Sequence, residues 1–314
     1  MTESLGRVVL VGVLDKEGST NLYMAKAFMK AGYEVIPCNY RTILHTYGPK
    51  TLATVLHKLS LDKPKLMLFS KCNGIDSSII SRCSLNCKTF LWFMDGLQTL
   101  KTVPEIVDNM NMADYSSCTG LGVAKDIQKK TGIKVHHIME GIDQEIYRPS
   151  IQSDHFKADI SFIGTANQER NYYINALTEN GFHVRAHGHG YNDKTGEIHG
   201  GMFNMVCSSS SAMLAISAEH DTSEYFSDRV FRYGACGSFV IHKYSPGMEK
   251  YFEDGKEVVY FHDVDSLIGV VKKYLADDAF PARSEIANNL YNKILTKHTW
   301  DTTVQKIIEV AEIQ

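Results

Sequence analysis

Two glycine-containing segments in the second half of the chain have residue types that hold phosphate groups. Gly164-Thr165 directly follows an apolar run and precedes Arg170, and His187-Gly188 follows the next run. Backbone N–H groups, a hydroxyl and a guanidinium together bind anions beside a strand end. We therefore predict an anion site made by Gly164, Thr165, Arg170, His187 and Gly188. The alternative for residues 164–170 is an ordinary strand-to-helix turn with a solvent-facing arginine. The alternative for the segment with His187 and Gly188 is a flexible turn with exposed histidines.

A carboxylate follows an apolar run in the first half. The run 89–94 leads straight into Asp95-Gly96. Ligands of open α/β sheets bind beyond the carboxyl ends of the strands, and a carboxylate there can orient or deprotonate a hydroxyl. We predict that Asp95 is catalytic, the alternative being a turn-capping aspartate. Lys71 and Asn73 follow the run 65–70 and are predicted to contact the same substrate.

Motifs for other chemistries are incomplete. The glycine-containing loop after the first apolar run matches neither a dinucleotide-binding fingerprint nor a P-loop. Cys72 and the pair Cys83-x-x-x-Cys87 could begin a zinc site, but no second close Cys/His pair completes it. Asp263 and Asp265 are predicted to begin a surface helix rather than to hold a metal. We expect neither a metal nor a cofactor.

The elements that must position these residues alternate along the chain. Short β-rich runs separated by helical patterns indicate βαβ units and parallel sheets. We predict strands over 7–13, 33–37, 65–70, 89–94, 134–139, 158–163, 182–186, 212–217, 237–241 and 257–260. We predict helices over 20–31, 51–59, 121–130, 168–179, 225–233, 264–275, 284–295 and 302–313.

A polar segment with Gly and Pro, residues 140–149, separates two such series. The length of 314 residues also favours two domains. We predict a doubly wound, Rossmann-like domain over 1–150 and a second one over 151–314 with closing helices.

The composition is that of a soluble globular protein, with 44% hydrophobic and 22% charged residues. A net charge of −3 disfavours indiscriminate nucleic-acid binding. The chain has no long apolar run and no visible secretion signal, and its 7 cysteines are scattered and odd in number. We expect a cytoplasmic protein without disulfides or a transmembrane span.

The stretch 222–249 and the residues after it contain a series of short motifs in a fixed order. They are Ser227-Asp228-Arg229-Val230-Phe231, Ala235-Cys236-Gly237, Ser245-Pro246-Gly247, the segment 254–261 and the segment 297–301. The series resembles the donor-binding region of GT-B glycosyltransferases (glycosyl transferases group 1), especially their spore-maturation, CgeB-like branch. The resemblance covers most of the second half and, loosely, the first.

This resemblance implies a GT-B fold in which two Rossmann-like domains face a cleft. The second domain would bind a nucleoside diphosphate sugar and the first an acceptor, in a metal-independent, retaining transfer. In the wider family, two glutamates separated by seven residues contact the donor sugar and the ribose. Glu224 matches the first glutamate, but Arg232 occupies the second position. Either another acidic residue takes its place or the nucleotide is held differently, with Arg232 on a phosphate.

Departure of a nucleoside diphosphate develops negative charge that cationic and hydroxyl groups must stabilise. Arg170, Arg229 and Thr165 are the first candidates for this role, and Ser245 with the Gly247 backbone are the second. Arg229 could instead form a surface ion pair with Asp228 or Glu224.

The predicted partner is a nucleotide-sugar donor. The acceptor is open between a glycan, a protein, a small molecule and a modified, hydroxymethylated DNA base, and so is the oligomeric state. The basic segment 125–137 is either a contact for an anionic acceptor or a solvated helix face. Two other functions compete: a non-catalytic module that binds nucleotide sugars, and an epimerase that acts on them.

Overall fold

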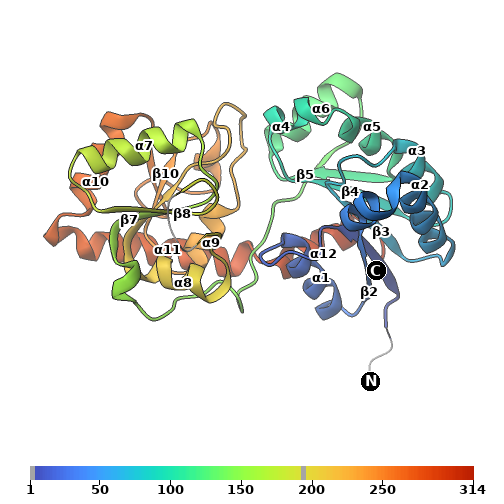
Figure 1. Ribbon diagram of the computed structural model, residues 1–314, viewed down its shortest axis with the longest axis horizontal. Helices are drawn as coiled ribbons and strands as arrows, with labels where there is room; N and C mark the ends of the chain where they lie inside the picture. Colours follow the sequence, from blue (N-terminus) through green and yellow to red (C-terminus); the bar gives the residue numbers. More distant parts are fainter. Residues whose placement is uncertain (1–3, 192–195) are drawn as a thin grey trace. The chain divides into compact units, whose positions relative to one another are not determined.

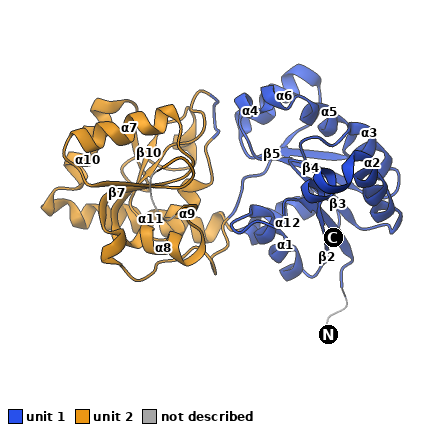
Figure 2. Cartoon of the chain, in the orientation of Figure 1, with its two compact units in different colours: residues 1–141, 222–225, 300–314 blue, residues 142–221, 226–299 orange. Residues whose placement is uncertain are grey.

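The computed structural model describes residues 4–191 and 196–314. The chain forms two compact units (Figure 2), of which the first comprises residues up to 141, 222–225 and 300–314. The second unit comprises residues 142–221 and 226–299. Each unit is a parallel sheet with helices on both faces (Figure 1), which confirms the doubly wound α/β class.

The sheet of the first unit has the strand order β2-β1-β3-β4-β5-β6. Its strands are β1 (Arg7–Gly12), β2 (Glu34–Asn39), β3 (Leu66–Ser70), β4 (Thr89–Phe93), β5 (Tyr115–Cys118) and β6 (His136–His137). Its helices are α1 (Thr20–Lys30), α2 (Tyr40–Leu61), α3 (Ser77–Ser84), α4 (Leu97–Thr102), α5 (Glu105–Met112), α6 (Leu121–Thr131) and α12 (Trp300–Ala311). Because β1 lies between β2 and β3, the direction of winding reverses between β1 and β3.

Strand β1 is apolar on both sides because helices cover both faces of the sheet. Val9 and Val11 face the core under α2, α3, α5 and α6, whereas Val8 and Leu10 face the core under α1 and α12. Figure 1 shows α12, from the red end of the chain, beside α1 in this unit. In that layer the ring centroids of Trp92 and Trp300 lie 5.6 Å apart, nearly perpendicular to each other.

The sheet of the second unit has the strand order β11-β10-β9-β7-β8. Its strands are β7 (Ala158–Ile163), β8 (Val184–His187), β9 (Ser210–Ala215), β10 (Val240–Lys243) and β11 (Val259–Phe261). Its helices are α7 (Gln168–Glu179), α8 (Gly200–Ser209), α9 (Arg229–Ala235), α10 (Val264–Tyr274) and α11 (Phe280–Lys297). Here the winding reverses between β7 and β9, so a crevice is expected beyond their carboxyl ends.

The compact units differ from the predicted division at residue 150. Residues 142–150 are part of the second unit, and the last 15 residues, 300–314, are part of the first. The physical reason is the apolar face of α12: Trp300, Val304 and Ile308 are buried against the first sheet. Helix α10 begins as predicted, since the Asp263 side chain accepts a bond from the Ser266 N–H in a capping box.

Candidate functional site

The second unit has a cavity of about 180 Å³ at the carboxyl edge of its sheet. Its walls come from the ends of β7 and β8, the segment before α8, and the start of α9. This is the edge where the winding reverses beside β7, as expected for a ligand site. The lining residues are Ile163, Gly164, Thr165, Gly188, His189, Glu197, Ile198, His199, Phe203, Asp228, Arg229 and Arg232.

Two turns pack closely to form the floor of this cavity. The Gly164 N–H donates to the His187 carbonyl at 2.9 Å, and the Ala166 N–H donates to the His189 carbonyl at 2.8 Å. A Cβ on Gly188, whose φ is +122°, would lie 2.4 Å from the Gly164 carbonyl oxygen. Glycine is therefore required at 188 for the two turns to meet.

Arg229 joins the carboxyl ends of β7 and β9. Its Nε donates to the Ile163 carbonyl at 2.9 Å, and its Nη1 donates to the Ile216 carbonyl at 3.0 Å and to the Ser227 hydroxyl at 2.8 Å. A Cβ on Gly164 would lie 2.7 Å from Arg229 Nη2, so this glycine leaves room for the guanidinium. The structure thus places Arg229 in the wall of the cavity, and Asp228 pairs with Arg232 instead.

Arg170 lies behind the turn and is not a lining residue. Its guanidinium donates to the Thr165 carbonyl at 2.7 Å and to the Ile216 carbonyl at 3.1 Å, and the residue is 7% exposed. Burial, and next the charge of Arg229, lower its pKa to about 10, which leaves it charged at neutral pH. The solvent-facing alternative is therefore wrong, and the Arg170 guanidinium supports the turn from behind.

A third cation, Lys243, adds to the positive charge around these arginines. Lys243 Nζ lies 3.0 Å from a carboxylate oxygen of Glu169 and donates to the Tyr173 hydroxyl at 2.6 Å. The pKa of His220 is lowered to about 3. Burial is the largest cause, and the positive charges of Lys243, Arg170 and Arg229 follow. The cluster stabilises negative charge on a ligand that reaches Arg229.

The other residues that were predicted to bind the nucleotide-sugar donor do not have the surroundings expected for that role. The His187 ring is fully buried with its centroid 6.1 Å from that of Phe156, so His187 contributes its backbone carbonyl to the turns rather than an exposed ring. Ser245 is also fully buried, with its hydroxyl 3.1 Å from His220 Nδ1. Gly247 precedes the short 3-10 turn Met248–Lys250. Ser245 and Gly247 do not line the cavity.

Arg232 lines the cavity together with a carboxylate. Its Nε lies 2.5 Å from Asp228 Oδ2, one helical turn earlier. Its guanidinium carbon lies 5.3 Å from the centroid of the Tyr147 ring. From the sequence, Asp228 was expected in the motif series of the resemblance or as an ion-pair partner of Arg229, and not as a partner of Arg232. The spacing of four residues between 228 and 232 was the available signal for this pair.

Glu224 belongs to the first unit and not to the cavity. The segment 222–225 is fastened to the start of α6, where the Gly122 N–H donates to the Ser223 carbonyl at 3.0 Å. The Glu224 carboxylate lies 3.6 Å from Lys125 Nζ and is almost fully buried. Within the first unit, the structure therefore places the Glu224 side chain beside α6.

The first unit brings Asp95 and Lys71 together at the carboxyl ends of β4 and β3. Lys71 Nζ is in close ionic contact with Asp95 Oδ2. Lys71 and Cys72 both have positive φ, 62° and 55°, so the turn after β3 is strained. Asn73 lies in the same turn, with its Oδ1 buried and without a hydrogen bond. Helix α4 begins directly after this site, with Gly96 as its N-cap.

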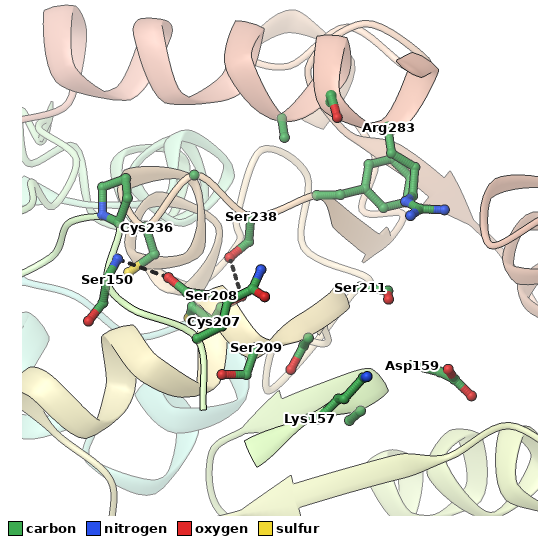
Figure 3. A pocket seen from close by; sticks show the side chains of 18 of the residues that line it. Ser150, Lys157, Asp159, Cys207, Ser208, Ser209, Ser211, Cys236, Ser238 and Arg283 are labelled. Atoms are coloured by element: carbon green, nitrogen blue, oxygen red, sulfur yellow. Dashed lines mark hydrogen bonds between the residues drawn. The ribbon is translucent and has the colours of Figure 1, made fainter. Parts of the chain in front are cut away.

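A larger hollow of about 1040 Å³ lies at the opposite, amino-terminal edge of the second sheet (Figure 3). Part of its hydroxyl lining is already engaged. Ser208 Oγ accepts from the Ser150 N–H at 3.0 Å, and Ser209 Oγ accepts from the Ser153 N–H at 2.8 Å. These bonds hold the segment 150–153, which precedes β7, against the end of α8. Because open α/β sheets bind ligands at the carboxyl edge, we take the smaller cavity as the candidate site.

Metal-binding groups, disulfides and membrane spans were all expected to be absent. Within residues 4–191 and 196–314, no group of three His, Cys, Asp or Glu side chains has the arrangement of a metal site. The seven cysteines are free thiols, six of them buried. None of the helices in these ranges is both long and apolar enough to cross a bilayer.

Comparisons with known proteins concern the family and the fold. Residues 170–309 match the model of a glycosyl transferase-like family. No curated protein sequence matches the chain. Among solved structures, Anabaena HepE in complex with UDP-glucose superposes with a TM-score of 0.71 at 12% identity, covering 98% of this chain and 100% of HepE. The sucrose-phosphate synthase of Thermosynechococcus elongatus has a TM-score of 0.71 at 11% identity, covering 98% of each chain.

An α-glucosyltransferase in complex with UDP-glucose and DNA containing an abasic site has a TM-score of 0.70 at 11% identity, covering 98% of this chain and 99% of that one. At such identities, these likenesses establish the fold. The chain has the two parallel-sheet domains of the GT-B architecture, as predicted.

Proposed function

We propose that this chain transfers a sugar from a nucleoside diphosphate sugar to an acceptor hydroxyl. The observation that carries the proposal is Arg229, held by two strand-end carbonyls in the wall of the cavity and backed by Arg170 and Lys243. A leaving diphosphate needs such preorganised positive charge where its own charge develops. The glycosyl transferase-like match over 170–309 supports the same reaction.

The remaining parts of the proposal concern the donor and the stereochemistry. The UDP-glucose complexes of HepE and of the α-glucosyltransferase make UDP-glucose the first donor to test. We further propose that transfer is metal-independent and retaining, and that the chain is a glycosyltransferase of the CgeB-like type. The cationic cluster supports the metal-independent part, because it can carry out the charge neutralisation that a bridging cation would otherwise supply.

In the first unit, we propose that Asp95 orients the acceptor hydroxyl and that Lys71 fixes the Asp95 carboxylate. Their ionic contact at adjacent strand ends supports this pairing. Asn73, in the same turn, is a further candidate for an acceptor contact.

A thermal-shift screen with UDP, GDP, ADP, TDP and their glucose conjugates tests the donor half of the proposal. A ligand that binds only the native state raises the melting temperature by mass action, so one diphosphate should stabilise the protein selectively. Release of that diphosphate from its sugar conjugate, with and without candidate acceptors, then tests transfer. Binding without turnover would favour a non-catalytic module, and no stabilisation by any diphosphate would refute the proposal.

A further inference from the structure

The large hollow at the amino-terminal edge of the second sheet is not explained by the binding of a nucleotide sugar (Figure 3). The six residues of β7, about 20 Å long, separate it from the smaller cavity, so one small ligand cannot occupy both. Its volume of about 1040 Å³ lies at the top of the range for small-molecule pockets, about 300–1,000 Å³. The hollow therefore has room for a ligand built from several small units.

Three exposed side chains in the lining are available to such a ligand. Lys157 precedes β7, Ser211 is in β9, and Asn288 is in α11. In the part of the chain that the structure describes, none of these three side chains makes a hydrogen bond or an ion pair. An ammonium donates hydrogen bonds, whereas a hydroxyl and an amide both donate and accept, so a matching ligand has donors and acceptors of its own.

An exposed aromatic ring also lines the hollow. Phe280, the first residue of α11, is 63% exposed. The Arg283 guanidinium carbon lies 5.6 Å from the centroid of this ring, and the same guanidinium donates to the Tyr274 carbonyl at 2.5 Å. The ring therefore packs against a side chain that is itself held in place, and its exposed surface offers an apolar contact beside the polar groups.

The charges of the lining oppose one another. The cations Lys157 and Arg283 face the same space as the carboxylates of Asp154 and Asp159. Figure 3 shows Arg283 on one side of Ser211, and Lys157 with Asp159 on the other. The end of α8 and the start of α11 also line the hollow, and these helix ends have partial charges of opposite sign. Neither an anion nor a cation is therefore favoured, in contrast to the cationic cluster at the smaller cavity.

A neutral ligand rich in hydroxyl groups matches this lining. Hydroxyls donate to carboxylates and accept from ammonium and guanidinium groups, and the C–H face of a sugar ring suits an aromatic contact. Peptides bind mainly by strand addition or through several apolar anchors, whereas Phe280 is the one exposed large apolar side chain in the described lining. We propose that the hollow binds a neutral oligosaccharide at a site separate from the nucleotide cavity. This inference does not depend on the proposed function.

Isothermal titration with five neutral hexasaccharides tests the proposal: maltohexaose, cellohexaose, mannohexaose, xylohexaose and chitohexaose. At least one should bind with a dissociation constant of about 1 mM or less. Hexagalacturonate, which has a carboxylate on each ring, and an octapeptide of glycine and serine should bind at least about tenfold more weakly than that hexasaccharide. Saturation with the diphosphate selected by the thermal-shift screen should leave hexasaccharide binding unchanged.

Two variants locate the binding in the hollow. Phe280→Ala and Asn288→Ala should each weaken hexasaccharide binding about 3- to 10-fold, because each removes one contact at an exposed position. The matched controls are Tyr172→Ala, which removes a 62% exposed ring in α7, and Asn292→Ala, one helical turn after Asn288. Neither Tyr172 nor Asn292 lines the hollow, so both controls should keep the wild-type affinity. All four variants should bind the diphosphate as the wild type does.

The proposal is overturned if none of the five hexasaccharides binds, or if hexagalacturonate or the octapeptide binds more tightly than they do. Unchanged hexasaccharide affinity in both Phe280→Ala and Asn288→Ala, or competition by the diphosphate, would also overturn it. If one variant fails to fold, the other still decides. These outcomes leave nucleotide binding, and so the proposed function, intact. Conversely, a protein that binds a hexasaccharide in the hollow but no nucleoside diphosphate would retain this site and lose the proposed function.

Discussion

Arg229→Ala should mainly lower the affinity for the nucleotide, whereas Arg170→Ala should mainly lower the free energy of unfolding. Both guanidiniums lie over the Phe162 ring, at 5.1 and 5.3 Å, and both donate to the Ile216 carbonyl. Only Arg229 lines the cavity. A sheltered, charge-assisted bond to a phosphate contributes about 1.5–3 kcal/mol, so Arg229→Ala should weaken nucleoside diphosphate binding about 10- to 100-fold.

The stability effects should have the opposite order. The Ile163 and Ile216 carbonyls that accept from Arg229 each keep a second donor, the Tyr233 hydroxyl at 3.3 Å and Arg170 Nη2 at 3.1 Å. Loss of Arg229 should therefore lower the free energy of unfolding by only about 1–2 kcal/mol. Loss of Arg170 removes two charged bonds from a nearly buried residue, at a cost of about 2–4 kcal/mol, and should weaken binding by less than about tenfold.

Urea unfolding and isothermal titration with the selected diphosphate measure the two quantities on each variant. Arg283→Ala, in the hollow at the other edge of the sheet, is the control and should leave the affinity unchanged. If Arg170→Ala lost more affinity than Arg229→Ala, the assignment of Arg229 to the ligand and Arg170 to the turn would be refuted.

Three more predictions follow from the same structure. Asp95→Asn should keep donor affinity and fold but lower turnover by about 10²–10⁴, as for loss of general acid–base assistance, and a destabilised variant with normal turnover would contradict the catalytic role. Turnover should survive EDTA; activity abolished by EDTA and restored by magnesium or manganese would overturn metal independence. Burial lowers the pKa of both His220 and His242 to about 3, so below about pH 6.5 the unfolded chain takes up protons that the native state refuses. The free energy of unfolding should therefore fall between about pH 6.5 and 4, by up to about 1.4 kcal/mol per pH unit for each histidine, and His242→Gln should show a shallower slope in urea titrations at pH 7, 6 and 5.

Apolar strands could be predicted from the sequence, and small polar ones could not. Strands β1, β3 and β4 are nearly continuous apolar runs, as required of strands covered on both faces. Strand β5 reads Tyr-Ser-Ser-Cys and was missed. Ser116 is tolerated inside because its hydroxyl donates to the Met110 carbonyl of α5 at 3.0 Å. That bond depends on packing between elements and leaves no periodic signal.

The candidate site was predictable in its location but not in its contacts. The positions after the strands identified Gly164, Gly188 and Arg229, because strand ends meet at one edge of a parallel sheet. The Arg170 guanidinium can donate to the Ile216 carbonyl because β7 and β9, which are distant in sequence, are neighbours in the sheet. Likewise, Glu224 was expected to precede a helix over 225–233. The helix begins at Arg229, and Glu224 lies with the first unit instead.

The assignment of α12 to the first unit has a consequence for synthesis on the ribosome. Residues up to 141 emerge before the second unit, but one face of their sheet, with Leu68, Phe90 and Trp92, is covered in part by residues 300–313, which are made after the second unit. A first unit that lacks α12 cannot reach its final stability until residues 300–313 have been made, so the part of its apolar face that α12 covers must be protected for the time taken to make the second unit. Truncation of the last 15 residues, 300–314, should for the same reason make the N-terminal half of the chain, not the C-terminal half, prone to aggregation.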